Sequence, residues 1–136
     1  MERMGKTLAI VALIALIVAL PGCSTAEETV YDITGNWQFN YTYVPGPGSD
    51  IFNFVFAGSI GSGTVMNQTE GHGGTYSVNG TAVVITLDYI DGHCGPTTET
   101  LSGTFTSPTT MSGDWDIVFA GLCVICGDIT WTAVKL

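Results

Sequence analysis

The sequence predicts an all-β fold: a single antiparallel meander of about eight strands closed into an up-and-down barrel. Apolar and polar residues alternate along most of the chain after residue 32, which is the period of a half-buried strand. No segment there has the 3.6-residue apolar period of an amphipathic helix. The links between strands are short, so sequence neighbours are expected to pair, and closure removes the edge strands. The alternative is a two-sheet β-sandwich, which usually needs longer crossover connections.

The first 22 residues have the organisation of a signal peptide. Arg3 and Lys6 precede an apolar run from Leu8 to Leu20. This run is shorter than the ~20 residues that span a bilayer. We therefore expect the segment to be cleaved and the remainder of the chain to be exported.

The end of this segment identifies the expected anchor. The tetrad Leu20-Pro21-Gly22-Cys23 resembles the lipobox of prokaryotic lipoproteins. The resemblance implies that Cys23 carries a lipid and becomes the new N-terminus, on the cell surface or facing the periplasm. It divides the chain into a signal peptide over 1–22, a lipidated cysteine with a short tether over 23–32, and a barrel domain over 33–136.

Aromatic residues at alternate positions mark the first predicted strands. Strands 33–44 and 51–59 each place such residues on one face: Trp37, Phe39, Tyr41 and Tyr43, then Phe52, Phe54 and Phe56. The glycines of Gly61-Ser62-Gly63 indicate a tight link into a short strand over 63–67.

A hairpin is predicted next. Asn79-Gly80 separates strands 73–78 and 81–90 and is typical of a type I′ turn, because both central residues need positive φ. The expected inward faces are Tyr76 and Val78, then Val83, Ile85, Leu87 and Tyr89.

Three more strands complete the series, over 98–106, 110–119 and 128–136. Their expected inward residues are Leu101, Gly103 and Phe105, then Met111, Gly113, Trp115, Ile117 and Phe119, and finally Ile129, Trp131 and Ala133. Asp114 and Asp116 fall on the opposite face, where they are expected to be solvated.

A short motif at the start of the first strand points to a family. Gly35-Asn36-Trp37 resembles the Gly-x-Trp signature of lipocalins and other calycin barrels. That resemblance implies that Trp37 plugs the closed end of the barrel and that a basic residue near the last strand, here Lys135, packs on it. Small lipocalin-like bacterial lipoprotein domains are the nearest comparison in length.

The charge of the chain excludes some partners. The formal net charge is -9, and Lys135 is the only Lys or Arg after the signal segment. Nucleic acid is therefore not an expected partner. An anionic membrane surface would repel the domain, so membrane attachment is expected through the lipid alone.

The remaining cysteines and both histidines are expected at one rim of the barrel. In an up-and-down barrel, the links after the first, third, fifth and seventh strands share the rim opposite the N-terminus. Those links contain His72, His93, Cys94, Cys123 and Cys126.

Three interpretations of this convergence stay open. In the chain-entropy model, a disulfide from Cys94 to Cys123 would stabilise the fold by roughly 3.5 kcal/mol and one from Cys123 to Cys126 by roughly 2 kcal/mol. An extracytoplasmic location favours oxidation of either pair. Three thiols and an imidazole, the Cys-x-x-Cys pair included, are also a tetrahedral zinc ligand set, so zinc is the one cofactor to consider. A redox dithiol is disfavoured, because the thioredoxin-type motif belongs at a helix N-terminus.

The function expected from these features is binding rather than catalysis, because no nucleophile elbow, zinc-protease helix or phosphate loop is present. The first hypothesis is a lipid-anchored barrel that binds a small apolar ligand or an envelope partner. The second is a structural scaffold lipoprotein with a filled barrel, and the third is a metal-binding or redox protein that uses the rim cysteines. The candidate ligand-pocket residues are Tyr43, Trp37, Phe54, Tyr76 and Trp115.

Overall fold

The computed structural model describes residues 29–44, 48–121, 123–124 and 127–136. The predicted signal peptide, Cys23 and Cys126 lie outside the described residues. Within them the chain forms eight strands: β1 (Gly35–Val44), β2 (Ser49–Gly58), β3 (Ser62–Asn67), β4 (His72–Asn79), β5 (Ala82–Asp91), β6 (Gly95–Ser107), β7 (Thr110–Phe119) and β8 (Asp128–Lys135).

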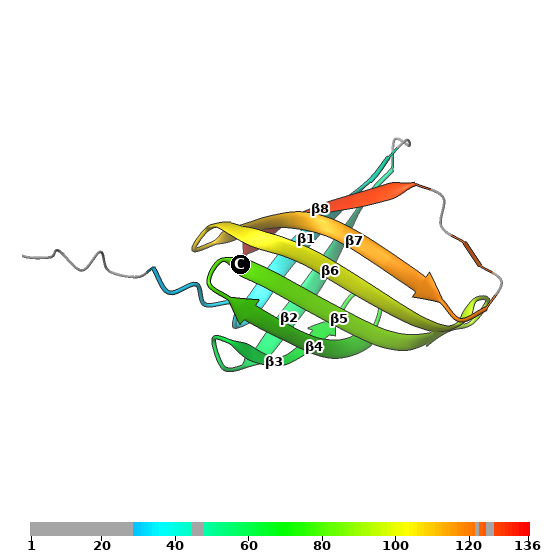
Figure 1. Ribbon diagram of the computed structural model, residues 1–136, viewed down its shortest axis with the longest axis horizontal. Helices are drawn as coiled ribbons and strands as arrows, with labels where there is room; N and C mark the ends of the chain where they lie inside the picture. Colours follow the sequence, from blue (N-terminus) through cyan, green and yellow to red (C-terminus); the bar gives the residue numbers. More distant parts are fainter. Residues whose placement is uncertain (1–28, 45–47, 122, 125–126) are drawn as a thin grey trace, which may run out of the picture.

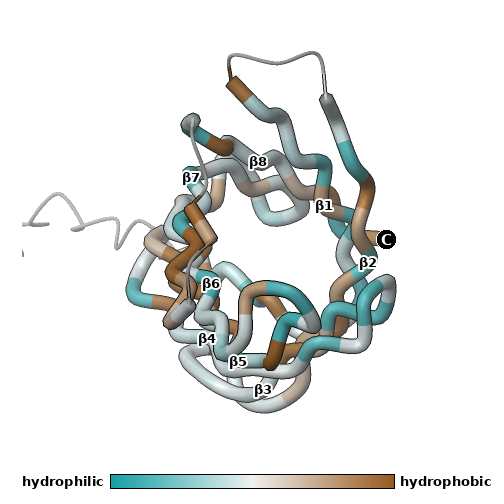
Figure 2. Tube along the Cα trace, turned by 90° about the vertical axis from the view of Figure 1, so that its right-hand side faces the viewer, coloured by the Kyte–Doolittle hydropathy of each residue, from teal (hydrophilic) through white to brown (hydrophobic). Residues whose placement is uncertain are grey.

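Each strand pairs with its sequence neighbours in antiparallel fashion, and β1 also pairs with β8, so the sheet closes into a single barrel. The ring of strands is visible in Figure 2. This confirms the predicted meander and barrel, and the structure is not a two-sheet sandwich. No helix long and apolar enough to cross a bilayer occurs in the described part of the chain.

The predicted inward faces are also confirmed. Along β1, positions 37, 39 and 41 are buried while their neighbours are exposed, and β2, β5 and β8 repeat the pattern. Phe39 lies at the centre of this core, with its ring 4.5 Å from that of Phe54 and 5.0 Å from that of Trp131. Asp114 and Asp116 are exposed on the outer face of β7, as expected.

One end of the barrel is sealed by the segment before β1, and we call it the closed end (Figure 1). The indole N–H of Trp37 donates to the Ile33 carbonyl at 2.7 Å, and Ile33 is fully buried. Tyr31 packs on Phe105 with ring centroids 4.9 Å apart.

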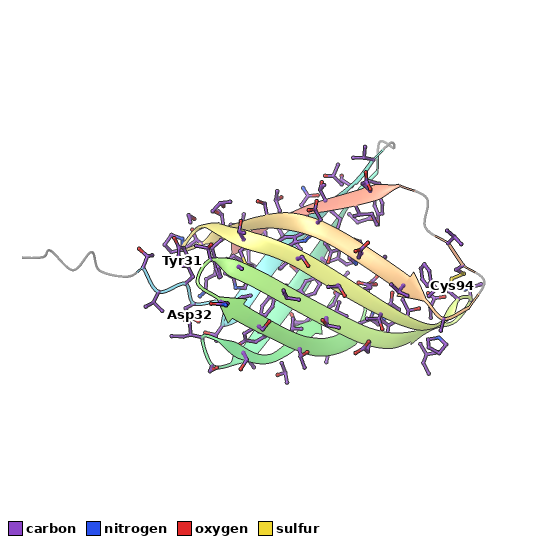
Figure 3. The ribbon with its side chains drawn as sticks, viewed as in Figure 1. Tyr31, Asp32 and Cys94 are labelled. Carbon is purple, nitrogen blue, oxygen red and sulfur yellow. A yellow bond between two sulfur atoms is a disulfide. The ribbon has the colours of Figure 1, made fainter. Side chains whose placement is uncertain are left out.

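Lys135 completes the closed end. Its Nζ donates to the Asp32 carbonyl at 2.8 Å and lies 5.8 Å from the centroid of the Trp37 ring. A basic residue packed on this tryptophan is the arrangement that the Gly-x-Trp resemblance implied. Tyr31 and Asp32 lie at this end in Figure 3, and Cys94 lies at the opposite end.

Most strand boundaries differ from the predictions by one to three residues, and the starts of the first and sixth strands affect the two ends of the barrel. The first strand begins at Gly35 rather than at 33, because Asp32 accepts from the backbone N–H and hydroxyl of Thr34 in a turn, and Gly35 has φ +105°. The sixth strand begins at Gly95 rather than at 98 and thus adds Thr97 to the inner wall beside Glu99.

Candidate functional site

The end opposite the closed end, which we call the rim end, contains a disulfide. Cys94, in the link between β5 and β6, is bonded to Cys123, which follows β7, with the Cα atoms 5.4 Å apart. The Asp91 carboxylate accepts from the backbone N–H groups of His93 and Cys94 at 2.7 and 2.8 Å and shapes this link. The predicted disulfide is therefore confirmed as Cys94–Cys123.

The disulfide changes the expected metal site. Neither bonded sulfur is a thiolate, and zinc binds cysteine as the thiolate. The set of three thiols and an imidazole is therefore not formed here. His72 and the cysteines, which the sequence places at one rim, are not in one group of potential ligands among the described residues.

Instead, His72 belongs to a polar group inside the rim end, which we call the rim cluster: Asn67, Glu70, His72, Tyr89 and Glu99. Glu99 is only 3% exposed because it points inward from β6. The Tyr89 hydroxyl donates to Glu99 Oε1, and the Tyr89 ring stacks on the His72 imidazole with centroids 3.6 Å apart.

The link between β3 and β4 holds the other side of the rim cluster. Asn67, which is 1% exposed, donates through Nδ2 to Glu70 Oε2 at 3.1 Å and accepts the backbone N–H groups of Thr69 and Glu70 at 3.0 and 3.3 Å. His72 Nδ1 lies 3.4 Å from Glu70 Oε2 without a hydrogen bond. Asn67 therefore fixes the turn that brings Glu70 and His72 together.

Three buried side-chain atoms in the described residues have no hydrogen-bond partner: Tyr41 Oη, His72 Nδ1 and Trp115 Nε1. The Tyr41 and Trp115 rings lie 4.2 Å apart, and Tyr41 is fully buried. Burial raises the pKa of Tyr41, and so do the nearby charges of Glu99 and Glu70. Buried polar groups are normally paired, so these atoms mark a place where the protein alone leaves its polar groups unsatisfied.

The electrostatics of the rim cluster are dominated by Glu99. Burial raises the pKa of its carboxyl from 4.5 to about 7; the hydrogen bond from the Tyr89 hydroxyl opposes this rise, and the charge of Glu70 adds to it. The pKa of Tyr89 is also raised, first by burial and then by its hydrogen bond to Glu99. Glu99 is therefore a carboxyl that titrates near neutrality inside the barrel.

This raised pKa makes a stability prediction. The folded protein keeps a proton on Glu99 that the unfolded chain releases between about pH 4.5 and 7, so stability falls as pH rises through this window. We expect Glu99→Gln, which keeps an acceptor for Tyr89, to raise the free energy of unfolding at pH 8 by up to about 3 kcal/mol. The gain should vanish at pH 4.

Urea unfolding of the variant and the wild type at both pH values measures this effect. The matched control is Asp116→Asn, which removes an exposed carboxylate and is expected to stay within about 0.5 kcal/mol of wild type throughout. A gain for Glu99→Gln that is equal at pH 4 and pH 8 would show that charge burial is not its cause.

The five predicted ligand-pocket residues do not share one pocket but are spread along the barrel. Trp37 and Tyr76 lie toward the closed end, where Trp37 bonds Ile33 and the Tyr76 hydroxyl donates to the Ser59 carbonyl. Phe54 is fully buried between the rings of Phe39 and Phe56, and it pairs across the strands with Asn67 of the rim cluster. Tyr43 and Trp115 lie toward the rim end. Tyr43 is half-buried and donates to Asp50 at 3.1 Å, and burial raises its pKa to about 12.

Trp115 is also reached from outside through a groove. β7 and β8 pair from Thr110 to Trp115, and beyond this point β7 continues beside β6 alone. The separation leaves a groove of about 370 Å³ that Trp115 lines together with Asp114, Asp116 and Asp128. The groove is acidic and opens on the wall of the barrel.

Comparisons with known proteins support the fold but do not assign the chain to a family. No protein-family model matches the chain, and no curated protein matches it. Among solved structures, a redesigned β-barrel is 19% identical with a TM-score of 0.58, over 76% of this chain and 90% of that one.

Two further structures contain a small ligand. The protein EF1p2_mFAP2b bound to DFHBI is 18% identical with a TM-score of 0.59, over 76% of this chain and 93% of that one. The redesigned β-barrel mFAP1, also bound to DFHBI, is 19% identical with a TM-score of 0.56, over 75% and 94% of the two chains. The chain thus shares the fold of these β-barrels, and identities this low show the fold alone.

Proposed function

We propose that this chain is a non-enzymatic, lipid-anchored barrel that works outside the cytoplasm and binds a small molecule at the rim end of its interior. The observation that carries the proposal is the set of unpaired polar atoms of Tyr41, His72 and Trp115 around a buried carboxyl. Two barrels of similar fold hold a small ligand, which is consistent with this use of the interior.

The ligand expected from this site has both apolar and polar parts. The closed half of the barrel is filled by aromatic side chains, so a bound molecule enters no deeper than Tyr41 and Trp115. Its apolar part would lie on these rings, and its polar part would face the rim cluster. A scaffold with a filled barrel accounts for the packed half but gives no role to the unpaired atoms.

The disulfide and the direction of the barrel support the location. A structural disulfide is typical of proteins exported to an oxidising compartment. The described chain begins at the closed end, so an anchor at Cys23 would direct the rim end away from the membrane. Intact mass of the protein purified from membranes tests the anchor, because Cys23→Ala is expected to abolish the added lipid mass.

Binding is tested with the apolar dye N-phenyl-1-naphthylamine and the intrinsic tryptophan fluorescence. Thr97 points inward beside Glu99, and Thr98 points outward and bonds Asp88. We expect dye binding to the wild type and to Thr98→Phe, and at least a tenfold loss for Thr97→Phe, which fills the rim end. Equal binding by the two variants would overturn the proposed location, and no saturable binding by the wild type would favour the scaffold.

A further inference from the structure

We propose that Glu70, His72 and Glu99 form a binding site for one divalent metal ion of the zinc, manganese or iron class, with zinc as the representative ion. The inference rests on the proposed function, because it names the occupant of the same rim end. Its ligand set differs from the cysteine-based zinc site expected from the sequence and shares only His72 with it.

The geometry fits a small ion. One ligand atom from each of the three residues lies within 4.8 Å of the others, and the residues come from the link before β4, from β4 and from β6. Ligands of a tetrahedral zinc ion lie about 3.3 Å apart, as follows from bonds of about 2.0–2.1 Å. His72 Nδ1 and Glu70 Oε2 are already 3.4 Å apart without a hydrogen bond between them.

Each of the three ligands is already oriented by a neighbour. The Tyr89 hydroxyl donates to Glu99, the Tyr89 ring stacks on His72, and Asn67 donates to Glu70 at 3.1 Å. Metal sites use such outer partners to fix carboxylate and imidazole ligands.

One observation independent of the acidic cluster points to a ligand here, and the charge of the cluster agrees with it. The Tyr41 side chain is fully buried, and its hydroxyl has no hydrogen-bond partner. The hydroxyl lies close enough to Glu99 and Glu70 for their charges to raise its pKa. In addition, Lys135 is the only Lys or Arg in the described residues, and it is bound to Asp32 at the closed end. No side-chain cation of Lys or Arg in the described chain balances the carboxylates of the rim cluster.

The donor types indicate the class of ion. One imidazole and two carboxylates suit zinc, manganese or iron better than calcium or magnesium, which take oxygen ligands. A set of three protein ligands leaves coordination positions for water or for a ligand held at the rim end.

The test is a titration of the metal-free, disulfide-bonded protein with Zn²⁺ by calorimetry, and with Co²⁺ by absorption, in a Cys126→Ser background that removes a sulfur ligand. We expect one ion per chain and a Co²⁺ spectrum without sulfur charge transfer. Glu99→Gln and His72→Gln should each weaken Zn²⁺ binding more than about 100-fold. Tyr89→Phe keeps the stacked ring and should weaken it by about 10–100-fold.

Matched controls separate this site from general acidity. Asp114→Asn with Asp116→Asn removes two exposed carboxylates, and His93→Ala removes the other histidine. Both are expected to leave Zn²⁺ affinity unchanged, and a loss equal to that of Glu99→Gln would overturn the site. Dye binding without Zn²⁺ binding would overturn the metal inference and leave the proposed function standing. Failure of both would overturn both.

Discussion

Replacing Trp131 with alanine is expected to lower the free energy of unfolding by about 3–5 kcal/mol, the range for large aromatic residues removed from a packed core. Trp131 is 1% exposed, packs 5.0 Å from the Phe39 ring and donates its indole N–H to the Asp114 carbonyl at 2.9 Å. The substitution therefore leaves a cavity and a carbonyl without its partner.

The glycines beneath Trp131 are the reason to expect the upper part of this range. Gly103 and Gly113 face each other across β6 and β7, and a Cβ at Gly103 would lie 2.5 Å from Trp131 Cζ2. Because neither glycine has a side chain, nothing on this wall can move into the space that the indole leaves.

Urea unfolding of the disulfide-bonded protein, followed by far-UV circular dichroism, measures the loss. Thr132→Ala, on the exposed face of the same strand, is the control and should change the stability by less than about 0.5 kcal/mol. Trp131→Phe, which keeps a ring on the glycines, should lose less than Trp131→Ala. A loss below about 1 kcal/mol for Trp131→Ala would show that the wall collapses despite its glycines.

The fold could be predicted because its determinants are local. Alternation along each strand assigned residues to the two faces, and Asn79-Gly80 correctly located the hairpin between β4 and β5. The predicted type I′ turn was wrong, because Asn79 pairs with Ala82 in the ladder and only Gly80, with φ +61°, has positive φ. Closure was harder to foresee, since it depends on pairing between β1 and β8 at opposite ends of the domain. The sequence signals for it were the short links of the eight-strand meander and the motif around Trp37.

The rim cluster was missed because its residues are polar where the pattern is expected to be apolar. Glu99 is in phase with the inward residues Leu101 and Phe105, and His72 is in phase with Tyr76. Continuing the alternation of inward-facing positions along β4 and β6 toward the rim would have placed the side chains of His72 and Glu99 inside the barrel. Their meeting could not be derived in this way, because it depends on how β4 and β6 are aligned on either side of β5.

Removing the disulfide is expected to lower the free energy of unfolding by about 3.5 kcal/mol, since it closes a loop across a sequence separation of 29 residues in the unfolded chain. The double variant Cys94→Ser with Cys123→Ser, or the wild type after reduction, should show this loss in urea unfolding. Cys126→Ser, which keeps the Cys94–Cys123 bond, is the matched control.

The location of this bond predicts a second, local effect. It joins the β5–β6 link to the chain after β7, at the end where β7 and β8 separate. Backbone amides near the ends of β5, β6 and β7 at the rim should therefore lose more hydrogen-exchange protection than those near Trp37. If the free energy of unfolding fell and hydrogen-exchange protection fell equally along the barrel, the disulfide would stabilise the protein only by restricting the unfolded chain. If protection at the rim fell selectively, the bond would also hold the rim end, and with it the position of Glu99, in the folded barrel.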